Sequence, residues 1–130
     1  MNPVSVLLID DNPDFLKLTS DFLRQSAEIQ VVGLATGGKA GLQLAHELKP
    51  DVVVIDLDMP DFSGLQAMPI LRDQLPATAI IALTVFDSEY YRHGALSAGA
   101  DAFVCKADLH KDLTAAIRRL TEAKRKTQAS

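Results

Sequence analysis

The sequence has little of several features, and each shortage excludes a class of protein. Its single cysteine, Cys105, has no partner within the chain, which excludes a scaffold held together by internal disulfides. No apolar run approaches the roughly 20 residues that a membrane-spanning helix needs, and the N-terminus lacks the basic-then-apolar layout of a signal peptide. The histidines His46, His93 and His110 share no metal-binding spacing. We therefore expect a cytoplasmic protein that does not enter a membrane.

Positive charge is also scarce over most of the chain. Of the 13 basic and 17 acidic residues, five basic residues but only Glu122 among the acids lie within 118–130, so the body before them is strongly acidic. Binding to nucleic acid depends on Lys and Arg contacts to phosphate, so we expect no direct nucleic-acid binding by this chain. The basic residues near the C-terminus instead suit the negative end of a helix dipole.

The sequence is well supplied with apolar residues, which make up 48% of its 130 positions. This suits one folded domain, residues 1–125, followed by 126–130 as a frayed tail or the start of a linker. Short apolar runs alternate with segments of helical periodicity. The runs expected to form strands are residues 4–9, 29–35, 52–55, 79–83 and 102–105. The alternation predicts an α/β fold with a parallel sheet covered on both faces and right-handed crossovers.

Each segment between the strands is expected to form a helix that buries one apolar stripe. The first begins at Pro13, capped by Asn12 or Asp11, and the second spans 41–48. The helix after residue 88 ends at Gly99, a natural C-terminal cap. Apolar spacing assigns residues of the first three helices to their apolar, inward faces: Phe15, Leu18, Phe22 and Leu23, then Leu42, Ala45 and Leu48, then Leu65, Met68, Leu71 and Leu75.

Polar residues stand where the predicted strands end. Asp10 and Asp11, Asp56, Thr84 and Lys106 follow the first, third, fourth and fifth strands. The carboxyl ends of parallel strands share one edge of a sheet, with neighbours about 4.8 Å apart, so these side chains are expected to converge. Two carboxylates 4 Å apart repel by roughly 4 kcal/mol at an effective dielectric near 20, so a cation is needed. Hard oxygen ligands from carboxylates, with no histidine or thiolate among them, select Mg²⁺ or a similar ion.

These groups predict phosphoryl transfer, a reaction in which positioning and charge neutralisation supply most of the catalysis. Asp56 would be the nucleophile that forms an aspartyl phosphate. Lys106 would pair with one phosphoryl oxygen, and the hydroxyl of Thr84 would donate to another.

The chain resembles a response-regulator receiver domain, the phosphoacceptor of bacterial two-component signalling, most of all the receivers of helix-turn-helix transcription regulators. The resemblance covers nearly the whole chain. The motifs that carry it are Leu7-Leu8-Ile9-Asp10-Asp11, Asp56-Leu57-Asp58-Met59-Pro60, Gly64, Thr84 and Gly99-Ala100-Asp101-Ala102-Phe103-Val104-Cys105-Lys106. It implies a single (βα)5 doubly wound, flavodoxin-like sheet with strand order 2-1-3-4-5, in which the first and third strands are neighbours.

The resemblance also implies roles for the site residues. Asp56 would accept a phosphoryl group from a histidine kinase or a phosphotransfer protein, and the domain would assist its own phosphorylation and dephosphorylation without being an enzyme in the usual sense. Asp11 and Asp56 would bind Mg²⁺ directly together with the main-chain carbonyl of Asp58, while Asp10 would act largely through water. These roles are what the resemblance to the receiver family implies.

Thr84 and Phe103 match the switch pair of the family. On phosphorylation Thr84 would move toward the phosphoryl group, and Phe103 would turn inward into the space that Thr84 leaves. The surface formed by the fourth helix, fifth strand and fifth helix would then change for a downstream protein partner or for a C-terminal output domain beyond this chain. The same face would allow a homodimer that forms on phosphorylation.

Three residues depart from the family pattern. Val85 follows Thr84 where a smaller residue is usual, and its bulk would narrow access to the site. Phe86, with Asp58, flanks the site at positions that tune the lifetime of the phosphoryl group. Ala107 replaces the usual proline after Lys106, so no cis peptide is expected there. These changes predict slow turnover of the phosphoryl group.

Two other functions compete with this interpretation. Asp56-Leu57-Asp58 matches the nucleophile pattern of haloacid-dehalogenase-type phosphatases, but Pro60 and the upstream acids Asp10 and Asp11 do not fit that family. A receiver-like module that binds partners without phosphorylation is the second alternative, supported only by Val85.

Overall fold

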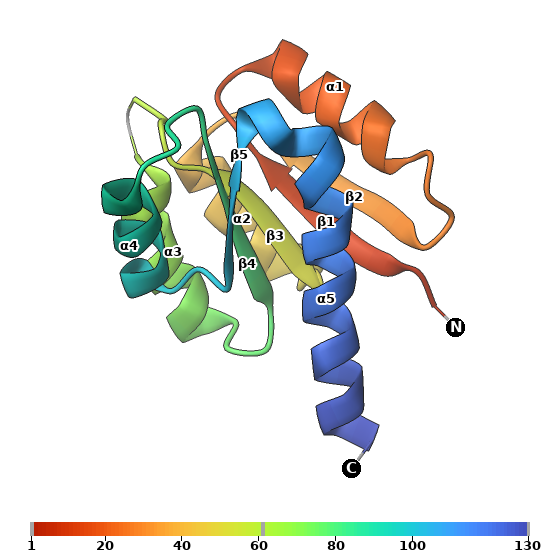
Figure 1. The fold of residues 1–130 in the computed structure, drawn as a ribbon. Helices are drawn as coiled ribbons and strands as arrows, with labels where there is room; N and C mark the ends of the chain where they lie inside the picture. The colour runs from red at the N-terminus through yellow and green to blue at the C-terminus, as the bar shows by residue number, and fades with distance from the viewer. Residues whose placement is uncertain (1, 61, 130) are drawn as a thin grey trace.

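The computed structural model describes residues 2–60 and 62–129, with side chains described as far as Ala123. Within these residues five strands alternate with five α-helices (Figure 1). The elements in chain order are β1 (Val4–Ile9), α1 (Pro13–Leu23), β2 (Ile29–Ala35), α2 (Gly38–Leu48), β3 (Val52–Asp56), α3 (Gly64–Gln74), β4 (Ala79–Thr84), α4 (Glu89–Ala98), β5 (Ala102–Cys105), a 3₁₀ turn η1 (Lys106–Asp108) and α5 (Leu109–Ala129).

The strands form one parallel sheet in the order β2-β1-β3-β4-β5, which confirms the predicted fold and strand order. β1 and β3 are paired from Val6 opposite Val52 to Ile9 opposite Ile55. This register places Asp10, which follows β1, beside Asp56, the last residue of β3, at the carboxyl edge. The strand order reverses at β1 and β3, and this reversal marks the usual place for a binding site in such sheets.

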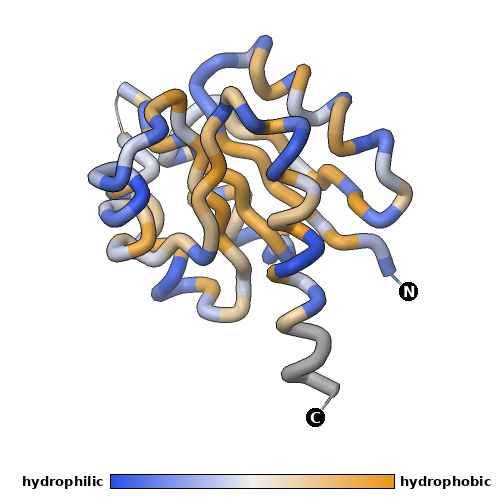
Figure 2. The backbone as a smooth tube through the Cα atoms, in the orientation of Figure 1, coloured by the Kyte–Doolittle hydropathy of each residue, from blue (hydrophilic) through white to orange (hydrophobic). Residues whose placement is uncertain are grey.

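Two apolar layers cover the faces of the sheet. One lies under α1 and α5 and includes Leu8, Val54 and Ile117, and the other lies under α2, α3 and α4 and includes Val53 and Met68. The apolar residues run along the central strands in Figure 2. Successive β3 side chains point to opposite faces, so both faces of this strand are buried, as its unbroken β-branched run predicts. Each fully buried side chain of this kind contributes roughly 1.5–3 kcal/mol.

Polar caps fix where α1 and α3 begin. The side chain of Asn12 accepts hydrogen bonds from the backbone N–H groups of Asp14 and Phe15, and Pro13 occupies the first turn of α1. Ser63 opens α3 through a capping box. Gly99, with φ of 120°, ends α4 as the sequence predicts. These caps anchor the loops that carry the acidic residues.

The predicted start of α2 at Gly41 is wrong, because the helix begins at Gly38. A Cβ atom at Gly38 would lie 2.5 Å from the carbonyl oxygen of Phe62, and one at Gly41 would lie 2.5 Å from Ile9 Cδ1. Close packing of this turn against its neighbours therefore supports the helix here, despite the low helix propensity of glycine.

Three of the predicted inward-facing residues are exposed. Leu18, Leu48 and Leu65 are 50%, 41% and 38% exposed. In α1 the predicted Leu23 is buried, together with Leu16, Thr19 and Ser20. The apolar stripe of a short helix is wider than the strip that the sheet covers, so spacing alone does not separate its centre from its margin.

For the predicted C-terminal tail, residues 126–130, the structure describes the backbone as far as Ala129 but not the side chains. The helix α5 continues through that backbone, and the last residue, 130, lies outside the described residues. Over the described part of the chain, no helix combines the length and apolar character that crossing a membrane requires. Cys105 is buried in β5, and His46, His93 and His110 are exposed.

Candidate functional site

Three carboxylates meet at the carboxyl edge of the sheet. Asp10 follows β1, Asp11 lies beside it, and Asp56 is the last residue of β3. One carboxylate oxygen of each lies within 4.8 Å of the others. Asp10 and Asp56 are each only 2% exposed, while Asp11 is open to solvent. The strand order thus brings together the three acids that the sequence placed at one edge.

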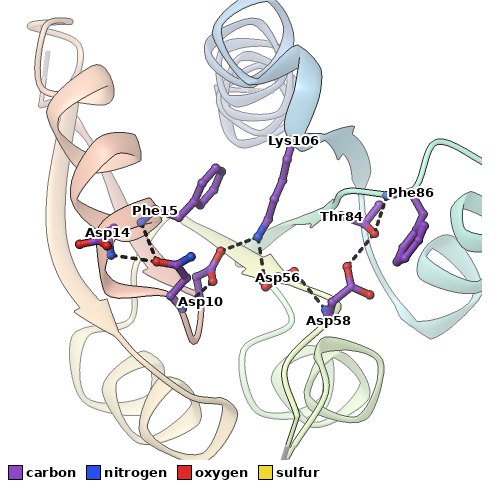
Figure 3. A network of polar contacts seen from close by, with 9 residues as sticks. Asp10, Asp14, Phe15, Asp56, Asp58, Thr84, Phe86 and Lys106 are labelled. Carbon is purple, nitrogen blue, oxygen red and sulfur yellow. Dashed lines mark hydrogen bonds and ion pairs between the residues drawn. The ribbon is translucent and has the colours of Figure 1, made fainter.

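A single ammonium group joins the two buried acids. Lys106 Nζ lies 2.9 Å from Asp10 Oδ2 and 3.2 Å from Asp56 Oδ2 (Figure 3). Lys106 enters from the start of η1, directly after β5, so residues far apart in the sequence share one contact. The lysine side chain is 15% exposed and both acid side chains are 3% exposed, so the pairing is largely shielded from water.

Backbone groups hold the second oxygen of each buried acid. The N–H of Asn12 donates to Asp10 Oδ1 over 2.9 Å, and the N–H of Asp58 donates to Asp56 Oδ1 over 3.0 Å. Both bonds reach two residues along the chain, which is the usual Asx turn. Each carboxylate therefore has one oxygen fixed by its own loop and the other bound to Lys106.

Burial governs the ionisation of Asp56. Its removal from water raises the pKa of the Asp56 carboxyl from 3.8 to about 6, and the nearby Asp10 charge acts in the same direction. The hydrogen bond from the Asp58 N–H and the charge of Lys106 oppose that rise. Burial lowers the pKa of Lys106, but its hydrogen bonds and charge contacts with Asp10 and Asp56 outweigh this effect and raise the pKa overall.

A glycine allows the helix α3 to approach the site. A Cβ atom at Gly64 would lie 2.5 Å from the carbonyl oxygen of Asp56 and 3.0 Å from Leu57 Cα. Real Cβ atoms essentially never come so close to backbone atoms. Gly64 therefore fits here because the first turn of α3 packs directly on the end of β3.

Thr84 has a partner that the sequence did not indicate. This side chain is fully buried at the end of β4, and its hydroxyl donates to Asp58 Oδ2 over 2.9 Å. The hydroxyl oxygen of Thr84 in turn accepts the N–H of Phe86 over 3.2 Å (Figure 3). The predicted phosphoryl-contacting hydroxyl is thus bound to the acid two residues after Asp56.

The loop after β4 presents two apolar side chains to solvent. Val85 is 59% exposed and Phe86 is 49% exposed. The ring of Phe86 stacks on Tyr91 of α4, with centroids 5.0 Å apart and planes 14° from parallel. The residues predicted to influence access therefore lie in an exposed position next to Thr84.

Phe103 lies on the face of the sheet that α3 and α4 cover. It is paired with Ala82 of β4 and is 8% exposed. The guanidinium of Arg92, on α4, lies 4.8 Å from the centre of its ring. The aromatic residue of the predicted switch is thus buried against α4 with a cation over one face.

The chemistry of the acidic cluster fits a divalent cation. Its three donor groups are carboxylates, the hard oxygen ligands that Mg²⁺ prefers. Among the described residues Lys106 is the cation recorded in contact with them, and its charge offsets only part of theirs. The family resemblance implies a further ligand, the main-chain carbonyl of Asp58, and that assignment stays a prediction.

Two features of the site were not predicted from the sequence: one contact of Asp58, a residue that was itself predicted, and the place of Phe15, which was not. The carboxylate of Asp58 holds Thr84, and the ring of Phe15 lies against Lys106 with 4.3 Å between Nζ and the ring centre. Asp58 gave a signal, because its spacing of two residues from Asp56 keeps it at the strand end. Phe15 gave none, since its place in the apolar pattern of α1 is that of an ordinary packing residue.

Comparison with known proteins agrees with the resemblance that the sequence motifs indicate. Residues 6–118 match the family model of the response regulator receiver domain. The chain is 37% identical over 118 residues to the response regulator protein VraR of Staphylococcus aureus, covering 89% of this chain and 56% of VraR. It thus spans about half the length of this relative.

Solved structures agree in fold. The signal receiver domain of the putative response regulator NarL from Mycobacterium tuberculosis is 29% identical, with a TM-score of 0.81 over 91% of this chain and 98% of that one. The response regulator domain of Thermotoga maritima CheB, at 24% identity, superposes with a TM-score of 0.82 over 95% of this chain and 98% of that one, a likeness of fold alone.

Proposed function

The chain belongs to the response regulator receiver domain family, whose members act in two-component signalling, and we propose that its Asp56 accepts a phosphoryl group from a histidine kinase or a phosphotransfer protein. The observation that carries the proposal is that both oxygens of this one carboxylate are held by hydrogen bonds. Asp56 is buried at a strand end, with one oxygen on Lys106 and the other on the Asp58 N–H. A nucleophile held in this way is oriented before its substrate arrives.

In the proposed reaction, a carboxylate oxygen of Asp56 attacks the phosphorus of a phosphohistidine. An oxygen–phosphorus bond forms, the phosphorus–nitrogen bond breaks, and the imidazole leaves with the electron pair. The Lys106 ammonium, already 3.2 Å from Asp56 Oδ2, donates to a phosphoryl oxygen as charge builds there. Asp56 must be ionised to attack, and in the absence of Mg²⁺ its burial opposes that ionisation by raising its pKa to about 6.

Asp10, Asp11 and Asp56, with the main-chain carbonyl of Asp58, would hold Mg²⁺. When bound, the ion neutralises the negative charge shared by the acids and the incoming phosphoryl oxygens. Asp10 and Asp56 are buried, whereas Asp11 is exposed. The cluster would therefore open to solvent at Asp11, the side from which a phosphoryl donor would approach.

Thr84 would report the phosphorylation by changing its acceptor. A threonine hydroxyl has one proton to donate, and here it goes to Asp58. A phosphoryl group adds about −1.5 to −2 charge and three strong acceptors, so it competes for that proton. As Thr84 moves, the N–H of Phe86 moves with it, and Phe103 turns into the space that Thr84 leaves. The surface of α4, β5 and α5 then changes for a partner.

Asp58, Val85 and Phe86 would set access and phosphoryl lifetime. Val85 and Phe86 lie at the exposed rim after β4, where they restrict the approach of donors and of the hydrolytic water. We expect slow turnover in consequence. A half-life of seconds for the phosphorylated protein would contradict this expectation.

The output of the signal would lie outside these residues. The curated relative VraR is longer than this chain, which covers 56% of it, so a C-terminal output domain or a separate protein partner is proposed. A homodimer formed on phosphorylation is the third route. We place the protein in the cytoplasm, where its phosphoryl donors reside, and assign no direct nucleic-acid contact to its acidic body.

Intact-mass spectrometry tests the phosphoacceptor directly. The protein is incubated with Mg²⁺ and acetyl phosphate beside an Asp56→Asn variant. One phosphoryl adduct on the wild type and none on the variant support the proposal. No adduct on the folded wild type with acetyl phosphate or with a panel of histidine kinases would instead favour the phosphorylation-independent binding module. The haloacid-dehalogenase alternative is set aside, because the receiver family model covers residues 6–118.

A further inference from the structure

The ammonium group of Lys106 has contacts on three sides. Two are the carboxylates of Asp10 and Asp56, at 2.9 Å and 3.2 Å. The third is the ring of Phe15, whose centre lies 4.3 Å from Nζ. Figure 3 shows the Phe15 ring next to the lysine chain, on the same side of the site as Asp10. A lysine has three N–H donors, and the two carboxylates take two of them.

The position of Phe15 is tied to that of Asp10 by one short turn. The N–H of Asn12 donates to Asp10 Oδ1 over 2.9 Å, and Asn12 Oδ1 accepts the N–H of Phe15 over 3.2 Å. The acid and the ring that flank the ammonium are therefore fixed by the same cap of α1. The ring is half-buried, so it shields that side of the ammonium from water.

Lysine is a compact charge on a flexible stem, and neither carboxylate alone fixes where it rests. The face of an aromatic ring carries negative potential and attracts a cation within about 6 Å of its centre. A ring at this distance therefore restrains the ammonium without competing for the hydrogen bonds that it must give to the carboxylates and, in the proposed reaction, to the phosphoryl oxygens.

We propose that Phe15 is a positioning residue that holds the ammonium of Lys106 over the phosphoacceptor pocket through the face of its aromatic ring. The proposal rests on the proposed function for its chemical consequence, which is faster phosphoryl transfer. The simpler explanation is that Phe15 only fills space beside the apolar layer under α1 and α5, in which case any apolar side chain of similar size would serve equally well.

The experiment replaces Phe15 by phenylalanines that carry one, two or three ring fluorines, and separately by leucine. Fluorine withdraws electron density from the ring and makes the potential of its face less negative, while the volume of the side chain changes little. Two quantities are measured, the rate of adduct formation with acetyl phosphate and Mg²⁺, and the order parameter of the Lys106 ammonium without Mg²⁺ by nitrogen-15 relaxation. Phe22→Leu is the matched control, because Phe22 is also half-buried on α1 but contacts His110.

We expect the rate to fall stepwise with fluorination, by about two- to fivefold for the trifluorinated ring and for Phe15→Leu, with a parallel fall in the order parameter. Phe22→Leu should leave both quantities unchanged. Either quantity remaining constant across the fluorinated series would overturn the proposal. If the wild type takes up no phosphoryl group at all, the proposed function fails, and the order parameter alone decides the role of Phe15.

Discussion

The hydroxyl of Thr84 donates a hydrogen bond of 2.9 Å to the carboxylate of Asp58, two residues beyond the proposed phosphoacceptor. Thr84 is fully buried at the end of β4, and Asp58 is exposed in the loop after β3. The bond therefore ties that loop to the end of β4. In the proposed phosphorylated state the same proton is needed by a phosphoryl oxygen. Asp58 therefore holds Thr84 in the arrangement of the unphosphorylated protein.

Removal of the Asp58 carboxylate should make phosphorylation easier. Asp58→Ala takes away the competing acceptor, and we expect uptake from acetyl phosphate to rise about two- to tenfold, the worth of one ordinary hydrogen bond. Asp58→Asn keeps an acceptor oxygen and should show a smaller increase. The adduct is followed by intact-mass spectrometry over time.

Asp87→Ala is the control for charge, since Asp87 is exposed on the loop after β4, whereas the Thr84 hydroxyl bonds to Asp58 and to the N–H of Phe86. An increase of the same size in Asp87→Ala would attribute the effect to net charge. Slower uptake in Asp58→Ala would show that Asp58 aids the reaction, contrary to the competition between acceptors.

The burial of Asp56 predicts a pH-dependent gain in stability for Asp56→Asn. The carboxyl has a pKa of about 6 in the folded protein and 3.8 as its reference value, so between these values the folded state keeps a proton that the unfolded state has released. Its contribution to stability is therefore complete below about pH 4 and lost as the pH rises through about 6. Above that range the ionised group destabilises the fold.

Asp56→Asn removes that ionisation. We expect its free energy of unfolding at pH 7.5, in the absence of Mg²⁺, to exceed that of the wild type by roughly 1–3 kcal/mol. The gain should disappear below pH 4. Urea unfolding at several pH values measures it, and a gain that is independent of pH would mean that the charge of Asp56 is not its cause.

Lys106 should oppose Mg²⁺ binding while supporting phosphoryl transfer. Lys106→Met removes the positive charge in contact with Asp10 and Asp56, so we expect Mg²⁺ affinity to rise several-fold, since the cation then meets less repulsion. Adduct formation should fall by about 10- to 100-fold, because a donor to the transferring group is lost. Calorimetric titration and intact-mass spectrometry measure the two effects.

A matched surface lysine provides the control for this prediction. Lys17 pairs with Asp21 on the exposed face of α1, and its side chain is 78% exposed. Lys17→Met should change neither Mg²⁺ affinity nor adduct formation measurably, because exposed pairs contribute little. Weaker Mg²⁺ binding in Lys106→Met would contradict the argument and would indicate that Lys106 organises the carboxylates for the ion.

The sheet and the meeting of the acids were predictable because both follow from the backbone. The β-branched run 52–55 ends on Asp56, and parallel strands present their ends at one edge, so the convergence of Asp10, Asp56 and Lys106 needs only the strand order. That order came from the family resemblance, and the structure confirms it.

The partners of individual side chains were not predictable. Thr84 can reach more than one acceptor at the strand ends, and its choice of Asp58 depends on the path of a loop that no periodicity describes. The exposure of Leu18 and Leu65 has a related cause, because spacing indicates the apolar side of a helix but does not show how much of that side the neighbouring elements cover.

The close approach of α3 to Asp56 predicts that Gly64 will not tolerate a side chain. In Gly64→Ala the new Cβ would lie 2.5 Å from the Asp56 carbonyl oxygen, so the backbone must shift. We expect a loss of about 1–3 kcal/mol in the free energy of unfolding, together with slower adduct formation.

Gly94 in α4 is the matched control, because nothing lies within 4 Å of its Cβ position. Gly94→Ala should gain up to about 1 kcal/mol, the helix propensity of alanine over glycine. Thermal and urea unfolding of the two variants measure the contrast. Equal effects at Gly64 and Gly94 would mean that helix propensity alone decides both, and that the contact between α3 and the end of β3 does not constrain the site.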